Sequence, residues 1–161
     1  MGRLDKKVAL ITGTGGGQGR EAALRFAREG AIVVGCDTNE KENTATAELL
    51  AKEGYVLYGK APVDLGDPDQ AQAWVEAAAA EHGQIDILYN NASAARFAPV
   101  HEMSVEDWHF TIRNEVDLLF YTTKHAWKFL AETIGIIINV SSTAAWGGSK
   151  IAGISAHAAA K

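Results

Sequence analysis

The chain has 161 residues, of which 47% are hydrophobic and 22% charged, and its formal net charge at pH 7 is -5. This length suits one domain with its own core, and the composition is that of an ordinary soluble globular protein. A negative net charge with scattered Lys and Arg argues against a nucleic-acid-binding surface, and no run approaches the roughly 20 apolar residues of a membrane helix.

The first part of the chain alternates short apolar runs with helical patterns. Residues 8–11 form a continuous apolar run, as expected for a parallel strand covered on both faces. A glycine cluster follows, and then a helix that ends at Gly30. Residues 31–35 predict the second strand, residues 44–52 a helix, and residues 55–58 a weaker third strand.

The same alternation continues to the end. Asp67 is a good N-cap for the next helix, and Pro68 fills its first position. Residues 85–89 predict the fourth strand, and residues 134–140 the fifth and most apolar one. Between them Ser104 begins a long helix. Its residues at a 3.6-residue period predict a buried stripe, made of Val105, Trp108, Ile112, Val116, Leu119 and Thr123.

This alternation predicts one α/β domain over residues 1–161, with a doubly wound, mostly parallel sheet and right-handed crossovers. The single cysteine, Cys36, excludes an intrachain disulfide framework, and its apolar neighbours predict a small buried side chain. The N-terminus lacks the apolar stretch of a signal peptide. We therefore expect a cytoplasmic protein without a membrane partner.

A glycine-rich segment, residues 12–19, lies between the first strand and the first helix. Glycines allow a tight turn and a close approach to a pyrophosphate, whose charge then lies at the helix N-terminus. Asp37 follows the second strand, where a carboxylate binds the adenosine ribose hydroxyls and repels a 2′-phosphate. No basic residue lies inside the segment, and Arg20 comes just after it. The pattern predicts a site for NAD rather than NADP; a structural turn with a solvated aspartate is the alternative.

Four short motifs follow the first, third, fourth and fifth strands. They are Thr-Gly-x-x-x-Gly-x-Gly, Asp64-Leu65, Asn90-Asn91-Ala92 and Asn139-Val140-Ser141-Ser142. Together they resemble the short-chain dehydrogenase/reductase family over essentially the whole chain. The resemblance implies a Rossmann-like sheet of order 3-2-1-4-5, with Asp64 and Leu65 beside the adenine and Asn91 and Ala92 in the middle of the groove. The residues that it assigns to the cofactor are Gly13, Gly17, Gln18, Gly19, Asp37, Asp64, Leu65, Asn91, Ala92 and Lys161.

The same resemblance implies a catalytic set made of an Asn, a Ser and a Tyr-x-x-x-Lys pair. Asn114 on the long helix is the best match for the Asn, although its place beside Glu115 also permits a plain surface position. Ser142, with Ser141 as the fallback, matches the serine that hydrogen-bonds the substrate oxygen. Lys161 matches the lysine that holds the nicotinamide ribose.

Four residues before the lysine, where the family has tyrosine, this chain has His157. No tyrosine follows Tyr121, so no shift of register restores the motif. An imidazole exchanges protons near neutrality, which makes His157 a candidate acid–base group. The imidazole is shorter than a phenol and reach is the first test of a proton-transfer group, so a vestigial or structural position is the alternative.

Two further departures from the family pattern stand out, at Ser93, which replaces a glycine, and at the end of the chain. Trp146 is a candidate for the substrate pocket. Family members continue past the lysine with the rest of a helix and two more strands, whereas this chain ends at Lys161. We therefore expect the fifth strand to be a sheet edge, and residues 1–161 alone to bind NAD weakly and to turn over no carbonyl substrate.

The leading hypothesis is an NAD-dependent oxidoreductase that moves hydride between the cofactor and an alcohol or carbonyl. Its catalytic residues would be Asn114, Ser142, His157 and Lys161. A catalytically silent NAD-binding module, a sensor or scaffold, is the alternative, and a methyltransferase is a third hypothesis that the Asn and Ser motifs disfavour. We expect a small-molecule substrate, no nucleic acid, and a homo-oligomer, either a dimer or a tetramer. The histidines lack metal-ligand spacing, so we expect no metal.

Overall fold

The computed structural model describes residues 2–146 and 153–161. Its strands are β1 (Val8–Thr12), β2 (Ile32–Cys36), β3 (Leu57–Lys60), β4 (Ile87–Asn90) and β5 (Ile136–Asn139). Its helical elements are α1 (Gly17–Arg28), α2 (Glu40–Lys52), α3 (Pro68–His82), α4 (Val105–Ile112), the π-helix η1 (Arg113–Asp117), α5 (Leu118–Thr133), the 3₁₀ turn η2 (Thr143–Trp146) and α6 (Ser155–Ala160). All strand pairs are parallel and their order is β3-β2-β1-β4-β5, which confirms the predicted doubly wound sheet.

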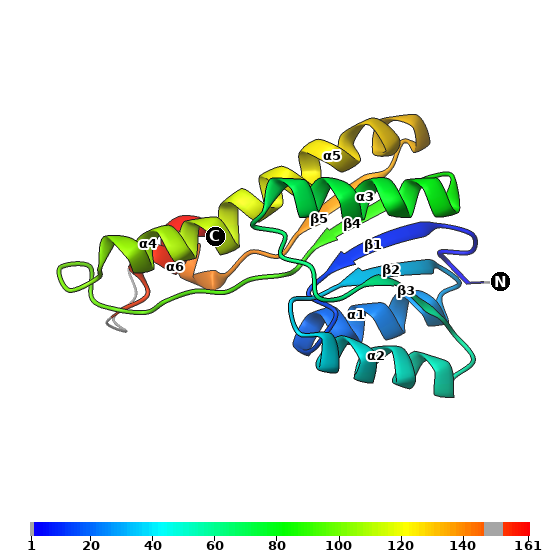
Figure 1. The fold of residues 1–161 in the computed structure, drawn as a ribbon, viewed down its shortest axis with the longest axis horizontal. Coiled ribbons are helices and arrows are strands. Elements are labelled where there is room, and N and C mark those ends of the chain that lie inside the picture. Colours follow the sequence, from blue (N-terminus) through cyan, green and yellow to red (C-terminus); the bar gives the residue numbers. More distant parts are fainter. Residues whose placement is uncertain (1, 147–152) are drawn as a thin grey trace.

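Helices cover both faces of the sheet. α3 and α5 lie side by side on one face, and α1 and α2 lie on the other (Figure 1). Because alternate side chains of a strand point to opposite faces, Leu10 packs with Trp74 of α3, whereas Ile11 packs with Ala23 of α1. α4 and α6 extend beyond the carboxyl ends of the strands, and the C-terminus lies beside them (Figure 1).

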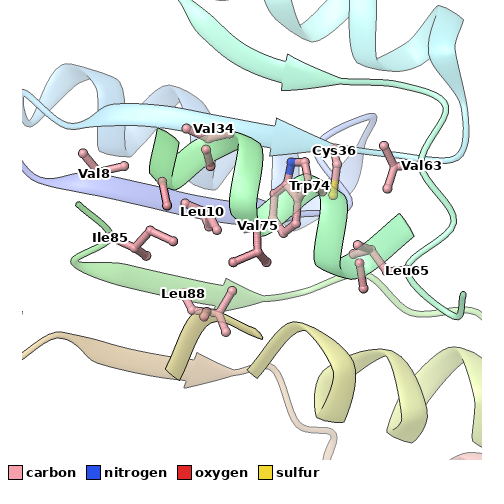
Figure 2. Packing of buried hydrophobic residues seen from close by; sticks show 14 of the residues in the cluster. Val8, Leu10, Val34, Cys36, Val63, Leu65, Trp74, Val75, Ile85 and Leu88 are labelled. Carbon is pink, nitrogen blue, oxygen red and sulfur yellow. The ribbon is translucent and has the colours of Figure 1, made fainter. Parts of the chain in front are cut away.

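Trp74 anchors α3 to the sheet. Its side chain is buried against β2, close to Cys36 (Figure 2), and its Nε1 donates a 3.3 Å hydrogen bond to the carbonyl oxygen of Gly35. Cys36 is itself fully buried, as predicted, and this burial raises the pKa of its thiol well above the usual value. The packing fixes the end of β2, from which Asp37 emerges.

Backbone and side-chain caps explain where the elements begin and end. Asp67 caps α3, and Ser104 caps α4, as predicted. α2 begins four residues earlier than expected, because Asn39 accepts a hydrogen bond from the amide of Glu42 and caps the helix there. β3 begins two residues later than expected, because the amide of Tyr55 still bonds to the last turn of α2.

The predicted buried stripe of the long helix is wrong. The buried residues of this segment are Thr111, Glu115, Leu118, Thr122, Ala126 and Leu130. Three residues of the predicted stripe, Val105, Trp108 and Val116, are exposed instead. Two further large side chains of this segment, Phe120 and Trp127, are exposed as well. The two stripes lie about one residue apart on the helix. Small threonine and alanine side chains allow α5 to pack closely on α3 and β4, and the larger apolar residues form an outer face.

Candidate active site

A groove of about 510 Å³ runs along the carboxyl ends of the strands. It lies where the chain changes from one face of the sheet to the other, the usual ligand position in an open parallel sheet. The predicted site residues that line it are Gly13, Gly17, Gln18, Asp37, Asp64, Leu65, Asn91, Ala92, Asn114, Ser142, His157 and Lys161. The tertiary structure therefore brings together candidates from the whole length of the chain.

The glycine segment forms a cradle at one end of the groove. Gly13 and Gly17 have φ angles of +74° and +49°, which side chains rarely adopt. Gly19 lies beneath the cradle rather than in the groove: a Cβ atom there would lie 2.0 Å from the carbonyl oxygen of Gly13. Among the described residues no side chain caps α1, so the first amides of this helix are free to bind an anion.

Asp37 faces the glycine segment. Its Oδ2 accepts a hydrogen bond of 2.8 Å from the amide of Gly15, and its Oδ1 accepts one of 2.8 Å from the amide of Asn39. These two contacts fix the carboxylate at the wall of the groove. A fixed acceptor at this place is suited to a pair of ribose hydroxyls.

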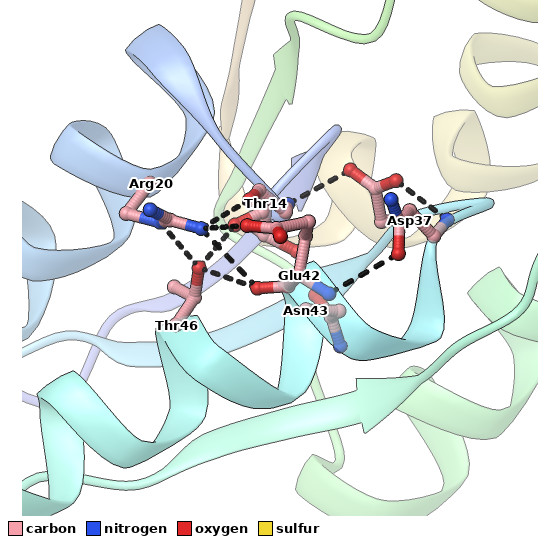
Figure 3. A network of polar contacts seen from close by, with 8 residues as sticks. Thr14, Arg20, Asp37, Glu42, Asn43 and Thr46 are labelled. Atoms are coloured by element: carbon pink, nitrogen blue, oxygen red, sulfur yellow. Dashed lines mark hydrogen bonds and ion pairs between the residues drawn. The ribbon is translucent and has the colours of Figure 1, made fainter.

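Arg20, the cation nearest to the cradle in sequence, is held by other groups (Figure 3). It forms an ion pair of 2.9 Å with Glu42 and donates to the hydroxyl of Thr46 and the carbonyl oxygen of Gly15. Its positive charge is therefore balanced by Glu42 on α2. This arrangement does not supply a free cation beside Asp37.

The next part of the groove wall is tied to the cradle. The Oγ1 of Thr12 accepts hydrogen bonds of 2.9 Å from the amides of Asn91 and Ala92. The side-chain amide of Asn91 donates back to the carbonyl oxygen of Thr12 at 3.0 Å. These contacts join the ends of β1 and β4.

Asp64 has a partner that sequence reasoning missed. Its carboxylate accepts two hydrogen bonds, of 3.2 and 2.8 Å, from the guanidinium of Arg113. These bonds raise the pKa of Arg113. The ion pair joins the loop after β3 to η1, 49 residues along the chain, and no local pattern signals such a contact.

Asn114 lies in the π-helix η1, between α4 and α5. Single π-turns inside α-helices are frequent at functional sites, since they turn a side chain out of the regular helical order. Asn114 lines the groove, and its Nδ2 donates to the carbonyl oxygen of Phe110 at 2.8 Å. Asn114 is partly buried and Glu115 beside it is only 1% exposed; the catalytic role of Asn114 stays a prediction.

The loop after β5 meets α6 at the far end of the groove. The hydroxyl of Ser142 accepts a hydrogen bond from the amide of Ala144, and the Nζ of Lys161 donates to the carbonyl oxygen of Val140 at 3.3 Å. The fallback residue Ser141 donates instead to the backbone oxygen of Lys161. Both serines line the groove, so the choice of Ser142 over Ser141 stays a prediction.

His157 is part of a polar cluster in α6. Its Nδ1 lies 2.9 Å from both carboxylate oxygens of Glu115, and the Nζ of Lys161 lies 3.9 Å from one of them. Sequence reasoning also missed Glu115. Glu115 lies four residues after Thr111 and three residues before Leu118, and this helical spacing could have placed it on the buried face of the helix.

Other predicted features lie outside the site. Trp146 is 91% exposed and is absent from the groove lining, so it does not form the described part of a pocket. Residues 147–152 of the loop lie outside the described residues. In the part of the chain that the structure describes, no group of His, Cys, Asp and Glu side chains could hold a metal ion. No helix within residues 2–146 and 153–161 is long and apolar enough to cross a membrane.

Comparison with known proteins agrees with this geometry. The family model described as short chain dehydrogenase matches residues 7–161. The chain belongs to the short-chain dehydrogenase/reductase family. That membership rests on the match over residues 7–161, and the order of the strands and the groove at the strand ends agree with it.

Individual relatives cover nearly all of this chain. It is 38% identical over 144 residues to D-threitol dehydrogenase of Mycolicibacterium smegmatis, covering 89% of this chain and 55% of that protein. It is 35% identical over 147 residues to meso-2,3-butanediol dehydrogenase of Serratia marcescens, covering 91% and 57%. The structure of NAD⁺-bound xylitol dehydrogenase superposes with a TM-score of 0.92 at 26% identity, covering 99% and 61%. The chain thus spans little more than half the length of the curated relatives.

Proposed function

We propose that the protein is an NAD-dependent oxidoreductase that interconverts a small-molecule alcohol and its carbonyl. The similarity to threitol, butanediol and xylitol dehydrogenases supports oxidation of a secondary or primary hydroxyl group. One observation carries the cofactor part of the proposal: Asp37 is fixed at the groove wall beside a glycine cradle. A catalytically silent NAD-binding module remains the alternative that experiment must separate.

The described residues fit a dinucleotide along the groove. The amides at the start of α1 would hold the pyrophosphate, and Asp37 would accept hydrogen bonds from the adenosine ribose. Asp64 and Leu65 would lie beside the adenine, and Asn91 and Ala92 along the middle. When bound, NAD(H) accepts or supplies the hydride.

At the far end the chain would manage the oxygen and its proton. Ser142 would hydrogen-bond the substrate oxygen and orient it. His157 would take the hydroxyl proton when an alcohol is oxidised and return it when a carbonyl is reduced. Lys161 would hold the nicotinamide ribose, and Asn114 would organise the polar groups between them.

The test is cofactor binding together with turnover. In any longer natural form that contains residues 1–161, we expect calorimetry to show NAD binding, and a panel of small polyols, diols and ketones to give NAD-linked absorbance changes with at least one substrate. Residues 1–161 alone should bind NAD weakly and turn over none of these compounds. His157→Ala and Ser142→Ala should each reduce kcat by about 10²- to 10⁴-fold while NAD still binds. NAD binding without turnover of any carbonyl or alcohol would favour the silent module, and absence of NAD binding would refute both.

Cytoplasmic location and a homo-oligomeric state remain predictions. The outer face of α4 and α5 exposes large apolar residues, among them Phe120 and Trp127. Burial of such a face between copies would be favourable, since the gain is about 25 cal/mol per Å² of apolar surface. Sedimentation of the purified protein decides between a monomer and a dimer or tetramer.

A further inference from the structure

A fully buried carboxylate lies behind the far end of the groove. Glu115 is 1% exposed and has three polar neighbours. Both of its oxygens lie 2.9 Å from Nδ1 of His157, and the hydroxyl of Ser93 donates a hydrogen bond to Oε1. The Nζ of Lys161 lies 3.9 Å from the same oxygen. A buried charge is strongly unfavourable unless it is paired and hydrogen-bonded, and this cluster supplies both kinds of partner.

The contact with Glu115 selects one form of the imidazole. An ionised carboxylate only accepts hydrogen bonds, so beside an ionised Glu115 it is Nδ1 of His157 that carries the shared proton. Nε2 is then the ring nitrogen that remains for a group in the groove, which His157 lines. The ring is further confined by the edge of Phe97, with 6.0 Å between the ring centroids.

The position of the ring is also set by the backbone. A bridge between Ala98 and Ile154 ties the start of α6 to the loop after β4. That loop also contains Ser93, whose hydroxyl contacts Glu115. The two replacements in the family pattern, Ser93 for glycine and His157 for tyrosine, therefore meet at one carboxylate. Glu115 thus gives the histidine at this position a hydrogen-bond acceptor for Nδ1.

We propose that Glu115 is the positioning residue that allows His157 to act as the acid–base group in place of tyrosine. Glu115 holds Nδ1–H and directs Nε2 to the groove, while Ser93 and Lys161 hold Glu115 itself. During oxidation of an alcohol, Nε2 takes the hydroxyl proton; during reduction, the same proton returns from Nε2 to the carbonyl oxygen. In both directions Nδ1 keeps its proton and its hydrogen bond to Glu115. This role rests on the proposed function.

The order of contacts excludes Ser93 as the nucleophile of a hydrolytic triad. In such a triad the serine contacts the histidine, and the carboxylate lies on the opposite side of the ring. Here the hydroxyl of Ser93 contacts Glu115 itself. Ser93 is therefore placed as a donor to the carboxylate and not as a nucleophile activated by His157.

The proposal has a test that does not depend on activity. Nitrogen-15 NMR distinguishes the protonated from the unprotonated ring nitrogen of a neutral histidine, and His157→Ala assigns its signals. We expect protonated Nδ1 and unprotonated Nε2 in the unmutated protein. Glu115→Leu should abolish this preference, and Ser93→Ala, which keeps the carboxylate, should weaken it. Thr133→Val is the matched control, because it removes a hydrogen bond from the distant end of α5.

Kinetics form the second arm. Glu115→Gln, which keeps the shape of the side chain, should lower kcat by at least about tenfold and by less than His157→Ala, with KM and NAD affinity little changed. In the His157→Ala background the same substitution should have no further effect on kcat, since Glu115 acts through the imidazole. A large additional loss there would overturn the proposal.

The two arms separate this proposal from the proposed function. A neutral imidazole protonated on Nε2 instead of Nδ1 in the unmutated protein, or a tautomer unchanged in folded Glu115→Leu and Ser93→Ala variants, overturns the role of Glu115 even if the enzyme is active. If the tautomer depends on Glu115 and no alcohol or carbonyl is turned over, the proposed function is refuted. The orientation of His157 by Glu115 is then still supported.

Discussion

Replacing Asp37 should change the preference between NAD and NADP. A 2′-phosphate has a charge of about -1.5 to -2 near neutral pH, and the Asp37 carboxylate is fixed at the groove wall by Gly15 and Asn39. Two unit charges 4 Å apart repel by about 1 kcal/mol in water and about 4 kcal/mol near a protein surface. Arg20 does not offset this repulsion, because Glu42 pairs with it at 2.9 Å. At about 1.4 kcal/mol per tenfold in affinity, we expect NAD to bind roughly 5- to 1,000-fold more tightly than NADP.

The assay is calorimetric titration of each cofactor. Asp37→Asn removes the charge and keeps an oxygen that can accept from the amide of Gly15, so NADP affinity should rise while NAD affinity falls only slightly. Glu42→Gln should raise NADP affinity as well, because it releases Arg20. Asp69→Asn removes an exposed carboxylate outside the groove and should leave both affinities unchanged. Equal affinity of the unmutated protein for the two cofactors would refute the argument.

Two further predictions concern stability. Gly19→Ala would place a Cβ atom 2.0 Å from the backbone oxygen of Gly13, so unfolding free energy should fall by about 1–3 kcal/mol and NAD affinity with it; wild-type stability in urea would contradict this. Burial alone raises the pKa of Asp86, but hydrogen bonds from Lys7 and Val8 outweigh it and hold the pKa below its usual value. Its stabilisation is therefore present above the unfolded pKa of about 4 and is lost as the pH falls through the lower folded pKa. Asp86→Asn should cost about 1–3 kcal/mol at pH 7, and chemical unfolding at successive pH values should show the difference shrinking in acid; a constant difference would contradict this assignment.

Local sequence determined the elements and the cofactor end of the groove. The alternation of apolar runs with helical patterns predicted the five-stranded parallel sheet, because the central strands of such a sheet are buried on both faces. Asp67 and Ser104 predicted helix starts correctly, since a cap depends on amides only two or three residues away. The glycine spacing and Asp37 predicted the cradle for the same reason: backbone conformation and strand end are properties of a short segment.

Only the tertiary structure decided which face of the long helix is buried and what surrounds His157. The segment has two candidate stripes, and the choice fell on the one whose small residues, such as Thr122 and Ala126, allow close packing on α3. That choice turned Glu115 inward, where it meets His157 42 residues later and Ser93 22 residues earlier. A charged residue in an amphipathic pattern is normally assigned to the surface, because the cost of burying it is cancelled only by partners that are distant in sequence. The partners of Glu115 come from two other segments, the loop after β4 and the C-terminal α6 region, which meet η1 only when the sheet has formed, so no local pattern could have predicted them.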